Sequence, residues 1–145
     1  MAQLTISEVA GQAGLRPSAI RYYERVGVLP PAQRVSGQRR YDTTTLHRLA
    51  VIQRARQTGF SLDEIRRLFF GFRGSTPASK RWQKLSQRKL VELESQRRQI
   101  QTMQRLLRRI MRRCHCGTLE ECGNRIFRKG LAAAESGARA AASAS

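Results

Sequence analysis

The sequence predicts a mainly α-helical protein in which a winged helix-turn-helix is followed by one long helix and a short cysteine-bearing segment. Capping boxes and glycine breaks divide residues 5–70 into short helices around one hairpin. Residues 80–113 contain neither glycine nor proline, and all three cysteines lie between positions 114 and 122. At 145 residues the chain has room for one compact domain and an extension.

Two short helices joined by a glycine turn are expected at the amino-terminal end. Thr5 with Glu8 three residues later is a capping box that begins the first helix, and Gly14 ends it. Pro17 suits the first turn of a second helix, which Gly27 closes. This arrangement predicts a helix-turn-helix, in which the second helix enters the major groove of DNA.

A small hairpin, the wing, is expected over residues 34–41, with its turn at Ser36 and Gly37. Two further helices follow it. Residues 42–44 cap the first, and Ser61 with Glu64 forms a second capping box that begins the next. The apolar faces of these helices are expected to complete a small core.

The long helix is expected to pair with a second copy of itself. After a Gly/Ser/Pro-bearing hinge over residues 71–77, residues 80–113 are long enough for about nine helical turns. Apolar residues recur there at steps of seven, three and four, which predicts a seam against a partner helix: Leu93, Ile100, Met103, Leu107 and Ile110. Trp82, near the start of this helix, is expected to anchor the dimer core.

The chain is strongly basic, with 28 Lys and Arg against 10 Asp and Glu and a formal net charge of +18. This balance is typical of nucleic-acid binders, although proteins that bind membranes or acidic polymers share it. No stretch approaches the roughly 20 apolar residues that span a bilayer, and the amino terminus lacks a basic segment followed by an apolar run. We therefore expect a cytoplasmic protein that does not act at a membrane.

Candidate DNA-binding residues fall on the second helix and on the wing. Arg side chains can read guanine, while hydroxyls fix the phosphate register. One of the two tyrosines on this helix is expected to pack inward, because a residue in step with Ile20 belongs to the core. The full candidate set is Ser18, Arg21, Tyr22 and Tyr23 on the helix, with Arg34, Arg39 and Arg40 on the wing.

Five motifs resemble the mercury-resistance regulator (MerR) family of transcription factors over residues 3–122: Ile6-Ser7-Glu8-Val9-Ala10, Ile20-Arg21-Tyr22-Tyr23-Glu24, Gly27-Val28-Leu29, Gly37-Gln38-Arg39-Arg40-Tyr41 and Gly59-Phe60-Ser61-Leu62-Asp63-Glu64-Ile65. The resemblance implies a winged helix-turn-helix and a long helix that forms an antiparallel coiled coil in a homodimer. It also implies that Arg21, Tyr23, Arg34 and Arg39 match family DNA contacts.

The resemblance further implies how such a dimer controls transcription. It would sit on double-stranded promoter DNA whose two recognition elements are too far apart for RNA polymerase. Effector binding would change how the dimer bends and untwists that DNA, which would align the elements. Both states would bind the promoter, and the protein would activate or repress it.

The three cysteines form a candidate metal site, with Cys114, Cys116 and Cys122 as ligands. Thiolates bind Cu(I), Zn(II) or Hg(II) strongly, and twelve Lys and Arg on the preceding helix favour the thiolate form. The resemblance places an effector loop here, with a cysteine pair separated by seven residues that Cys114 and Cys122 match. We therefore expect a thiolate-bound metal ion.

The cysteine pattern departs from the family in two ways. Divalent-metal sensors of the family usually add a cysteine at the start of the long helix, where this chain has Ser79, so a monovalent ion is mildly favoured, although Cys116 offers a third ligand. The family's superoxide-response branch holds a [2Fe-2S] cluster with four cysteines, the first of which falls on Met111 here. A cluster would need a substitute such as His115, so it is the weaker alternative.

Four regions follow from these observations: residues 1–75 as the DNA-binding domain, 76–113 as the dimerisation helix, 114–130 as the cysteine effector loop with a short helix, and 131–145 as a disordered Ala/Ser/Gly-rich tail.

Two other functions stay open. One is a redox or electrophile sensor that uses the same thiols, and the other is an architectural DNA-binding protein without an effector. The sequence shows no nucleophile-base pair, phosphate loop or paired carboxylates, so we do not expect an enzyme.

Overall fold

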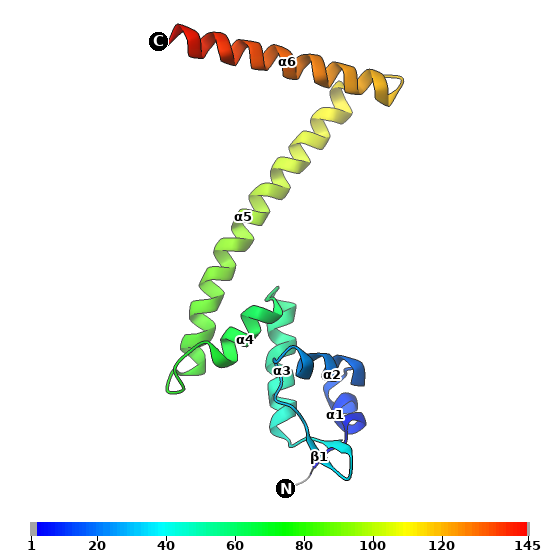
Figure 1. The fold of residues 1–145 in the computed structure, drawn as a ribbon, viewed down its shortest axis with the longest axis vertical. Helices are drawn as coiled ribbons and strands as arrows, with labels where there is room; N and C mark the ends of the chain where they lie inside the picture. The colour runs from blue at the N-terminus through cyan, green and yellow to red at the C-terminus, as the bar shows by residue number, and fades with distance from the viewer. Residues whose placement is uncertain (1–2, 145) are drawn as a thin grey trace. The chain divides into compact units, whose positions relative to one another are not determined.

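The protein is mainly helical in the computed structural model, which describes residues 3–144 and confirms the predicted fold class. Six helices and one hairpin lie within this range (Figure 1). They fall into two compact units, the first ending at Glu94 and the second beginning at Ser95. No helix within the described range is both long and apolar enough to cross a membrane.

The first unit contains four complete helices. They are α1 (Ile6–Ala13), α2 (Pro17–Arg25), α3 (Thr44–Gln57) and α4 (Leu62–Phe70). Capping residues or a proline mark the ends of three of them, α1, α2 and α4. The capping boxes predicted at Thr5 and Ser61 are both present. Gly14 ends α1 in the left-handed conformation, with φ of 66°, and Pro17 opens α2 as expected. These observations confirm the helix-turn-helix.

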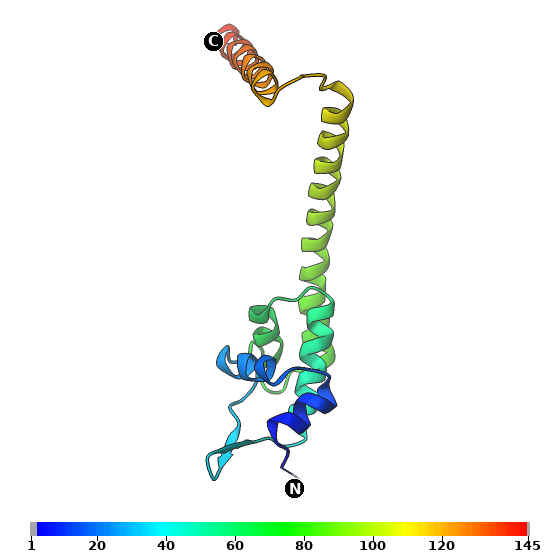
Figure 2. The ribbon, with the colours of Figure 1, turned by 90° about the vertical axis from the view of Figure 1, so that its right-hand side faces the viewer.

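The wing is a two-stranded antiparallel hairpin that projects away from the helices of this unit (Figure 2). Strand β1 (Gln33–Val35) pairs with β2 (Gln38–Arg40). Ser36 and Gly37 both have positive φ, 51° and 78°, which is the conformation of a two-residue turn whose twist matches the strands. The predicted turn is confirmed.

The core of the first unit draws on every helix that surrounds it, and it includes the first turns of α5 (Ala78–Arg113). Leu85 of α5 is buried in this core, and Trp82 packs edge-on against Phe60 with ring centroids 5.9 Å apart. The compact unit therefore extends past residue 75, where the DNA-binding domain was expected to end. Trp82, which was expected to anchor the dimer core, also packs against the core of its own chain.

The second unit contains the rest of α5 and a long helix α6 (Leu119–Ser143). The structure differs here from the short helix and disordered tail expected from the sequence. Alanine dominates residues 132–144 and has the highest intrinsic helix propensity, so this segment continues the helix although no residue of α6 is buried. Thr118 caps α6 by accepting a hydrogen bond from the Glu121 backbone N–H at 3.2 Å. The spacing of these two residues is a capping-box signal that the sequence analysis missed.

Candidate DNA interface and thiol site

One face of α2 presents a continuous set of exposed polar and aromatic side chains. Ser18, Arg21, Tyr22 and Arg25 are all exposed, at spacings that place them along one side of a helix. The Arg25 guanidinium lies over the Tyr22 ring, 5.2 Å from its centroid. Tyr23 instead packs against the core, which confirms that one of the two tyrosines points inward.

The wing is fastened to α2 through the carboxylate of Glu24. Arg39 Nε donates to Glu24 Oε2 at 3.3 Å, and the Tyr41 hydroxyl donates to Glu24 Oε1 at 2.6 Å. Burial of the ring, together with this hydrogen bond, raises the pKa of Tyr41. The two surfaces on which DNA contacts were predicted are therefore held in a defined relation to each other.

The three wing arginines differ in their surroundings. Arg34 is exposed and donates from Nη1 to the Gly37 carbonyl at 3.2 Å. Arg40 is half-buried and donates from Nη2 to Gln38 Oε1 at 3.1 Å. Arg39, by contrast, reaches across to α2, so it has a structural role that its position in the sequence did not indicate.

A buried lysine holds the first turns of α5 against α4. Lys89 is only 7% exposed, and its Nζ lies 2.9 Å from Glu64 Oε2 and 2.8 Å from Glu92 Oε2. These two hydrogen bonds raise the pKa of Lys89. Its ammonium also lies 5.7 Å from the centroid of the Phe60 ring. Sequence reasoning missed this residue, because a lysine in a basic helix is normally solvent-exposed.

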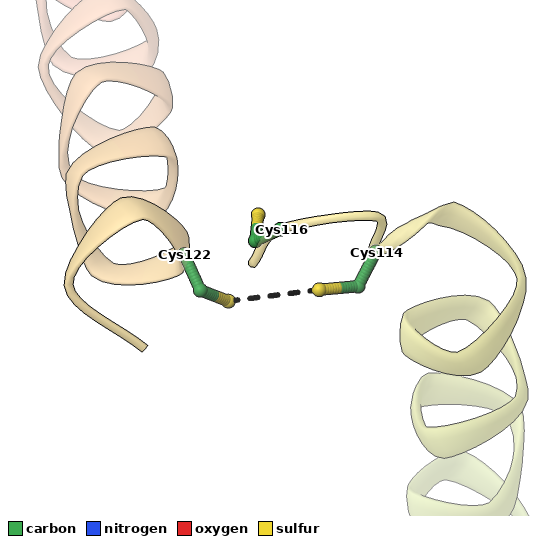
Figure 3. Close-up of side chains that lie close together, drawn as sticks. All are labelled: Cys114, Cys116 and Cys122. Atoms are coloured by element: carbon green, nitrogen blue, oxygen red, sulfur yellow. Dashed lines mark hydrogen bonds between the residues drawn. The ribbon is translucent and has the colours of Figure 1, made fainter. Parts of the chain in front are cut away.

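The three cysteines come together in the second unit (Figure 3). Their sulfur atoms all lie within 4.8 Å of one another, and the Cys114 and Cys122 sulfurs are 4.0 Å apart. The predicted metal-ligating residues therefore form one cluster. His115, the candidate substitute ligand, is exposed and is not a member of this cluster.

The ends of two helices position these thiols. Cys114 directly follows α5, and its backbone N–H donates to the Ile110 carbonyl at 2.8 Å. Cys122 lies in the first turn of α6, where its N–H donates to the Thr118 carbonyl at 3.2 Å. The Glu121 carboxylate accepts from the Gly117 N–H at 3.0 Å, which joins the loop to the start of α6. The loop between the helices thus carries Cys116 to the other two sulfurs.

The thiols are not equivalent. Hydrogen bonds with the Cys116 backbone N–H, the Cys116 thiol and the Cys122 thiol lower the pKa of Cys114. Partial burial and its hydrogen bond to Cys114 raise the pKa of Cys116. The positive charge of Arg125 acts to lower the pKa of both. Cys114, which is exposed, is therefore the more readily ionised of these two and the better first ligand.

A hollow of about 360 Å³ adjoins the sulfurs. Besides the three cysteines, its lining consists of two isoleucines and four cationic side chains: Ile110, Ile126, Arg109, Arg113, Arg125 and Lys129. The basic character of α5 is evident from the sequence, but the cations of α6 were not predicted to belong to the site. Arg125 lies three residues after Cys122 and Lys129 four residues after Arg125, so all three share one helix face. This spacing could have indicated that both cations lie near the thiols.

The spacing of the sulfurs fits a soft metal ion. With a metal–sulfur bond of about 2.3 Å, the sulfurs of a trigonal site lie about 4.0 Å apart, those of a tetrahedral site about 3.8 Å and those of a linear two-thiolate site about 4.6 Å. The 4.0 Å separation of Cys114 and Cys122 lies in this range, and the 4.8 Å limit for the whole group is slightly above the linear value. Two or three thiolates could therefore bind one ion with small side-chain adjustments.

The helix-turn-helix, the wing and the exposed face of α2 define the class of this protein, a winged helix-turn-helix DNA-binding protein. Two family descriptions match the chain: "MerR HTH family regulatory protein" over residues 4–70 and "MerR, DNA binding" over residues 46–110. The chain belongs to the MerR family of DNA-binding transcription regulators. Its relatives are transcription regulators and not enzymes.

Two relatives span most of the chain. The HTH-type transcriptional regulator HmrR of Rhizobium leguminosarum bv. viciae is 32% identical over 119 residues, which cover 82% of this chain and 92% of that protein. The HTH-type transcriptional regulator CueR of Salmonella typhimurium is 32% identical over 120 residues, covering 82% of this chain and 87% of that protein.

A solved structure supports the same assignment. The transcription regulator PbrR691 of Ralstonia metallidurans CH34, crystallised in complex with lead(II), superposes with a TM-score of 0.68 at 27% identity. The match covers 79% of this chain and 90% of that one. The winged helix-turn-helix predicted from the sequence is thus shared with a metal-binding relative.

Proposed function

We propose that this protein is a homodimeric MerR-type regulator that senses a thiophilic metal ion at Cys114, Cys116 and Cys122. The observation that carries the proposal is the grouping of three thiol sulfurs within 4.8 Å of one another. Relatives support it, since one is named "Heavy metal-dependent transcription regulator 2" (Rhizobium meliloti, 33% identical) and PbrR691 was crystallised with lead(II). The four cations beside the sulfurs would offset the negative charge of the thiolates.

The ion would be soft and bound by one chain alone. Cu(I) needs only two thiolates, which Cys114 and Cys122 would supply, whereas Zn(II), Hg(II) or Pb(II) would recruit Cys116 as a third. A [2Fe-2S] cluster fits less well, because the group within the described residues holds three cysteines.

The helix α2 would contact the bases of DNA, and the wing would contact its sugar-phosphate backbone. Ser18, Arg21 and Tyr22 would face the major groove, while Arg34 and Arg40 would lie along the backbone. Tyr23 and Arg39 would contribute chiefly by positioning, since one packs inward and the other is paired with Glu24. Metal binding would change how the dimer distorts promoter DNA and so how RNA polymerase engages it.

The first test is the metal content and absorption spectrum of protein purified without oxygen, compared with a Cys114→Ser, Cys122→Ser double variant. Stoichiometric copper, zinc or another soft ion that disappears in the variant would support the metal sensor. Iron with visible charge-transfer bands would instead indicate a cluster. Wild-type protein that carries no metal and takes up none under reducing conditions would contradict the proposal.

A second test addresses transcription from a promoter that the protein occupies. We expect wild-type protein to occupy the promoter with and without metal but to change transcription only when metal is added. The Cys114→Ser, Cys122→Ser variant should still occupy the promoter and should not respond. Loss of DNA binding on metal addition would contradict control by DNA distortion.

Oxidation of the same thiols is the second candidate, because the Cys114 and Cys122 sulfurs lie only 4.0 Å apart. A peroxide would take two electrons and two protons from the pair, form the disulfide and be reduced to two waters, or to an alcohol and one water. Metal-free protein that forms this disulfide and changes transcription on peroxide addition would favour this function over metal sensing.

A further inference from the structure

We propose that the hollow beside the thiols is a docking site for a small carboxylate-bearing thiol that carries the metal, so that the ion arrives as an anionic metal–thiol complex. The inference rests on the proposed metal sensing and adds the ligand class from which the site takes its ion. It stands on the charge, the size and the lining of the hollow.

The positive charge of the hollow favours an anionic ligand. Arg109 and Arg113 are one turn apart on α5, and Arg125 and Lys129 are one turn apart on α6. Like charges at this spacing destabilise a helix, and here two such pairs line the same hollow. None of the described residues that line it is Asp or Glu. An anionic occupant would relieve repulsion on both helices at once.

The size and the apolar lining indicate more than a bare ion. The volume of about 360 Å³ lies in the range of pockets that hold small organic ligands. Ile110 and Ile126 present aliphatic surface between the cations. A phosphate or a sulfate would pair with the cations but would leave that surface uncovered. A carboxylate-bearing thiol matches all three features, since its carboxylates pair with guanidinium groups, its chain covers the isoleucines and its sulfur holds the metal.

Transfer from such a carrier is an exchange of ligands. The Cys114 sulfur, which is exposed, forms a bond to the metal as the bond from the metal to one carrier sulfur breaks. The proton of the Cys114 thiol passes to the departing carrier sulfur. Cys122, 4.0 Å away, repeats the exchange with the second carrier sulfur. The ion keeps its oxidation state, and two carrier thiols leave.

The test compares the rate at which the full-length protein takes copper from two donors. One is Cu(I) bound to glutathione, which carries carboxylates. The other is Cu(I) bound to 2-mercaptoethanol, whose hydroxyethyl group is uncharged. Loading is followed by alkylating unoccupied cysteines at timed intervals and counting them by mass spectrometry. The variant is Arg125→Gln with Lys129→Gln. The control is Arg128→Gln with Arg139→Gln, which removes the same charge from α6 at exposed positions outside the hollow.

We expect the Arg125, Lys129 variant to load about tenfold more slowly from the glutathione complex, since electrostatic steering contributes factors of this size. Loading from the mercaptoethanol complex should change by less than about twofold, and the control should match wild type with both donors. The tenfold difference should shrink at about 0.5 M salt. Equal slowing with both donors, or no slowing with either, would overturn the inference.

The copper bound at equilibrium separates this inference from the function on which it rests. If wild-type protein and the variant both load fully, and the variant is not specifically slower with the glutathione complex, the metal site is supported and the docking site is contradicted. If wild-type protein binds no copper from either donor, both copper sensing and the docking site are contradicted.

Discussion

The carboxylate of Glu64 both caps α4 and pairs with a lysine of α5. It accepts a hydrogen bond from the Ser61 backbone N–H at 2.7 Å, which completes the capping box of α4, and it lies 2.9 Å from Lys89 Nζ of α5. Burial acts to raise its pKa, but the hydrogen bonds from Lys89 and Ser61 outweigh burial and lower it. The charge of one residue therefore links the cap of one helix to the packing of the next.

Replacing Glu64 by Gln tests this charge, because an amide oxygen can still accept the capping hydrogen bond. A carboxyl whose pKa is lowered by folding stabilises the protein above its unfolded pKa, and this contribution is lost as the pH falls through the folded pKa. We expect Glu64→Gln to lower the free energy of unfolding by about 1 kcal/mol at pH 7. In urea titrations, the difference from wild type should shrink as the pH falls below about 4.3, the unfolded pKa of Glu, and should vanish below the lowered folded pKa. A difference that is independent of pH would contradict the assignment, and Glu135→Gln on α6 is the control.

Arg81 closes the connection between α4 and α5. Its guanidinium donates to four backbone carbonyls, those of Leu68, Phe69, Arg73 and Thr76, at 2.8 to 3.3 Å. Two of these belong to the last turn of α4, where carbonyls have no partner within the helix.

We expect Arg81→Met to lower the free energy of unfolding by about 2 kcal/mol, since partly buried carbonyls lose a charged donor while the aliphatic bulk is retained. Arg88→Met, at an exposed position of the same helix, should change it by less than about 0.5 kcal/mol. Equal effects of the two changes in urea unfolding would show that the four hydrogen bonds contribute nothing.

At the scale of helices and strands, two glycines of the α4–α5 connection differ in what surrounds them. A Cβ at Gly71 would lie 2.7 Å from the Arg67 carbonyl oxygen and 2.9 Å from its Cα, both backbone atoms that cannot move independently of α4. A Cβ at Gly74 would meet nothing within 4 Å. The two positions form a matched pair within one connection.

We expect Gly71→Ala to destabilise the protein by about 1 to 3 kcal/mol, because the end of α4 must shift to admit the methyl group. Gly74→Ala should be neutral or slightly stabilising, since it reduces the freedom of the unfolded chain. Thermal unfolding of the two variants measures the difference. A Gly74→Ala variant less stable than Gly71→Ala would contradict the geometry at the end of α4.

Elements whose ends depend on neighbouring residues could be predicted from the sequence. The boxes at Thr5 and Ser61, the turn at Ser36 and Gly37 and the break at Gly14 are such cases, because each residue acts within three or four positions along the chain. The length of α6 could not be predicted in this way. Residues 132–144 contain no apolar residue larger than alanine, and amphipathic periodicity of larger apolar residues was the signal on which the helix assignments relied.

The candidate site also has features that the sequence could predict and features that it could not. The clustering of Cys114, Cys116 and Cys122 follows from nine residues of sequence. The hollow beside them combines side chains of two helices, and the roles of Lys89 and Trp82 depend on contacts with α4 and with Phe60. Such pairings are set by tertiary packing, so a pattern within one helix does not reveal them.

At the scale of the whole molecule, the seam of α5 determines the proposed assembly. Ile100, Met103 and Leu107 follow coiled-coil spacing, and each is more than half exposed within the chain. Ile110, the last residue of the expected seam, lines the hollow beside the cysteines. Apolar side chains in such a row would be covered by a second copy of α5, and the seam of that copy would supply the same residues.

Ile100→Glu with Leu107→Glu places two carboxylates in this seam, where pairing would bring them close to their counterparts on the second copy or bury them without partners. We expect the variant to sediment as a monomer, while wild type and a Gln101→Glu, Thr102→Glu control sediment as dimers. Affinity for a promoter with two half-sites should fall by about a hundredfold, because the second half-site no longer adds an intramolecular contact. Affinity for a single half-site should be unchanged, since α2 and the wing lie outside the seam. A dimeric variant would show that a different surface holds the two copies together, and a monomer with full promoter affinity would show that DNA recognition does not require pairing.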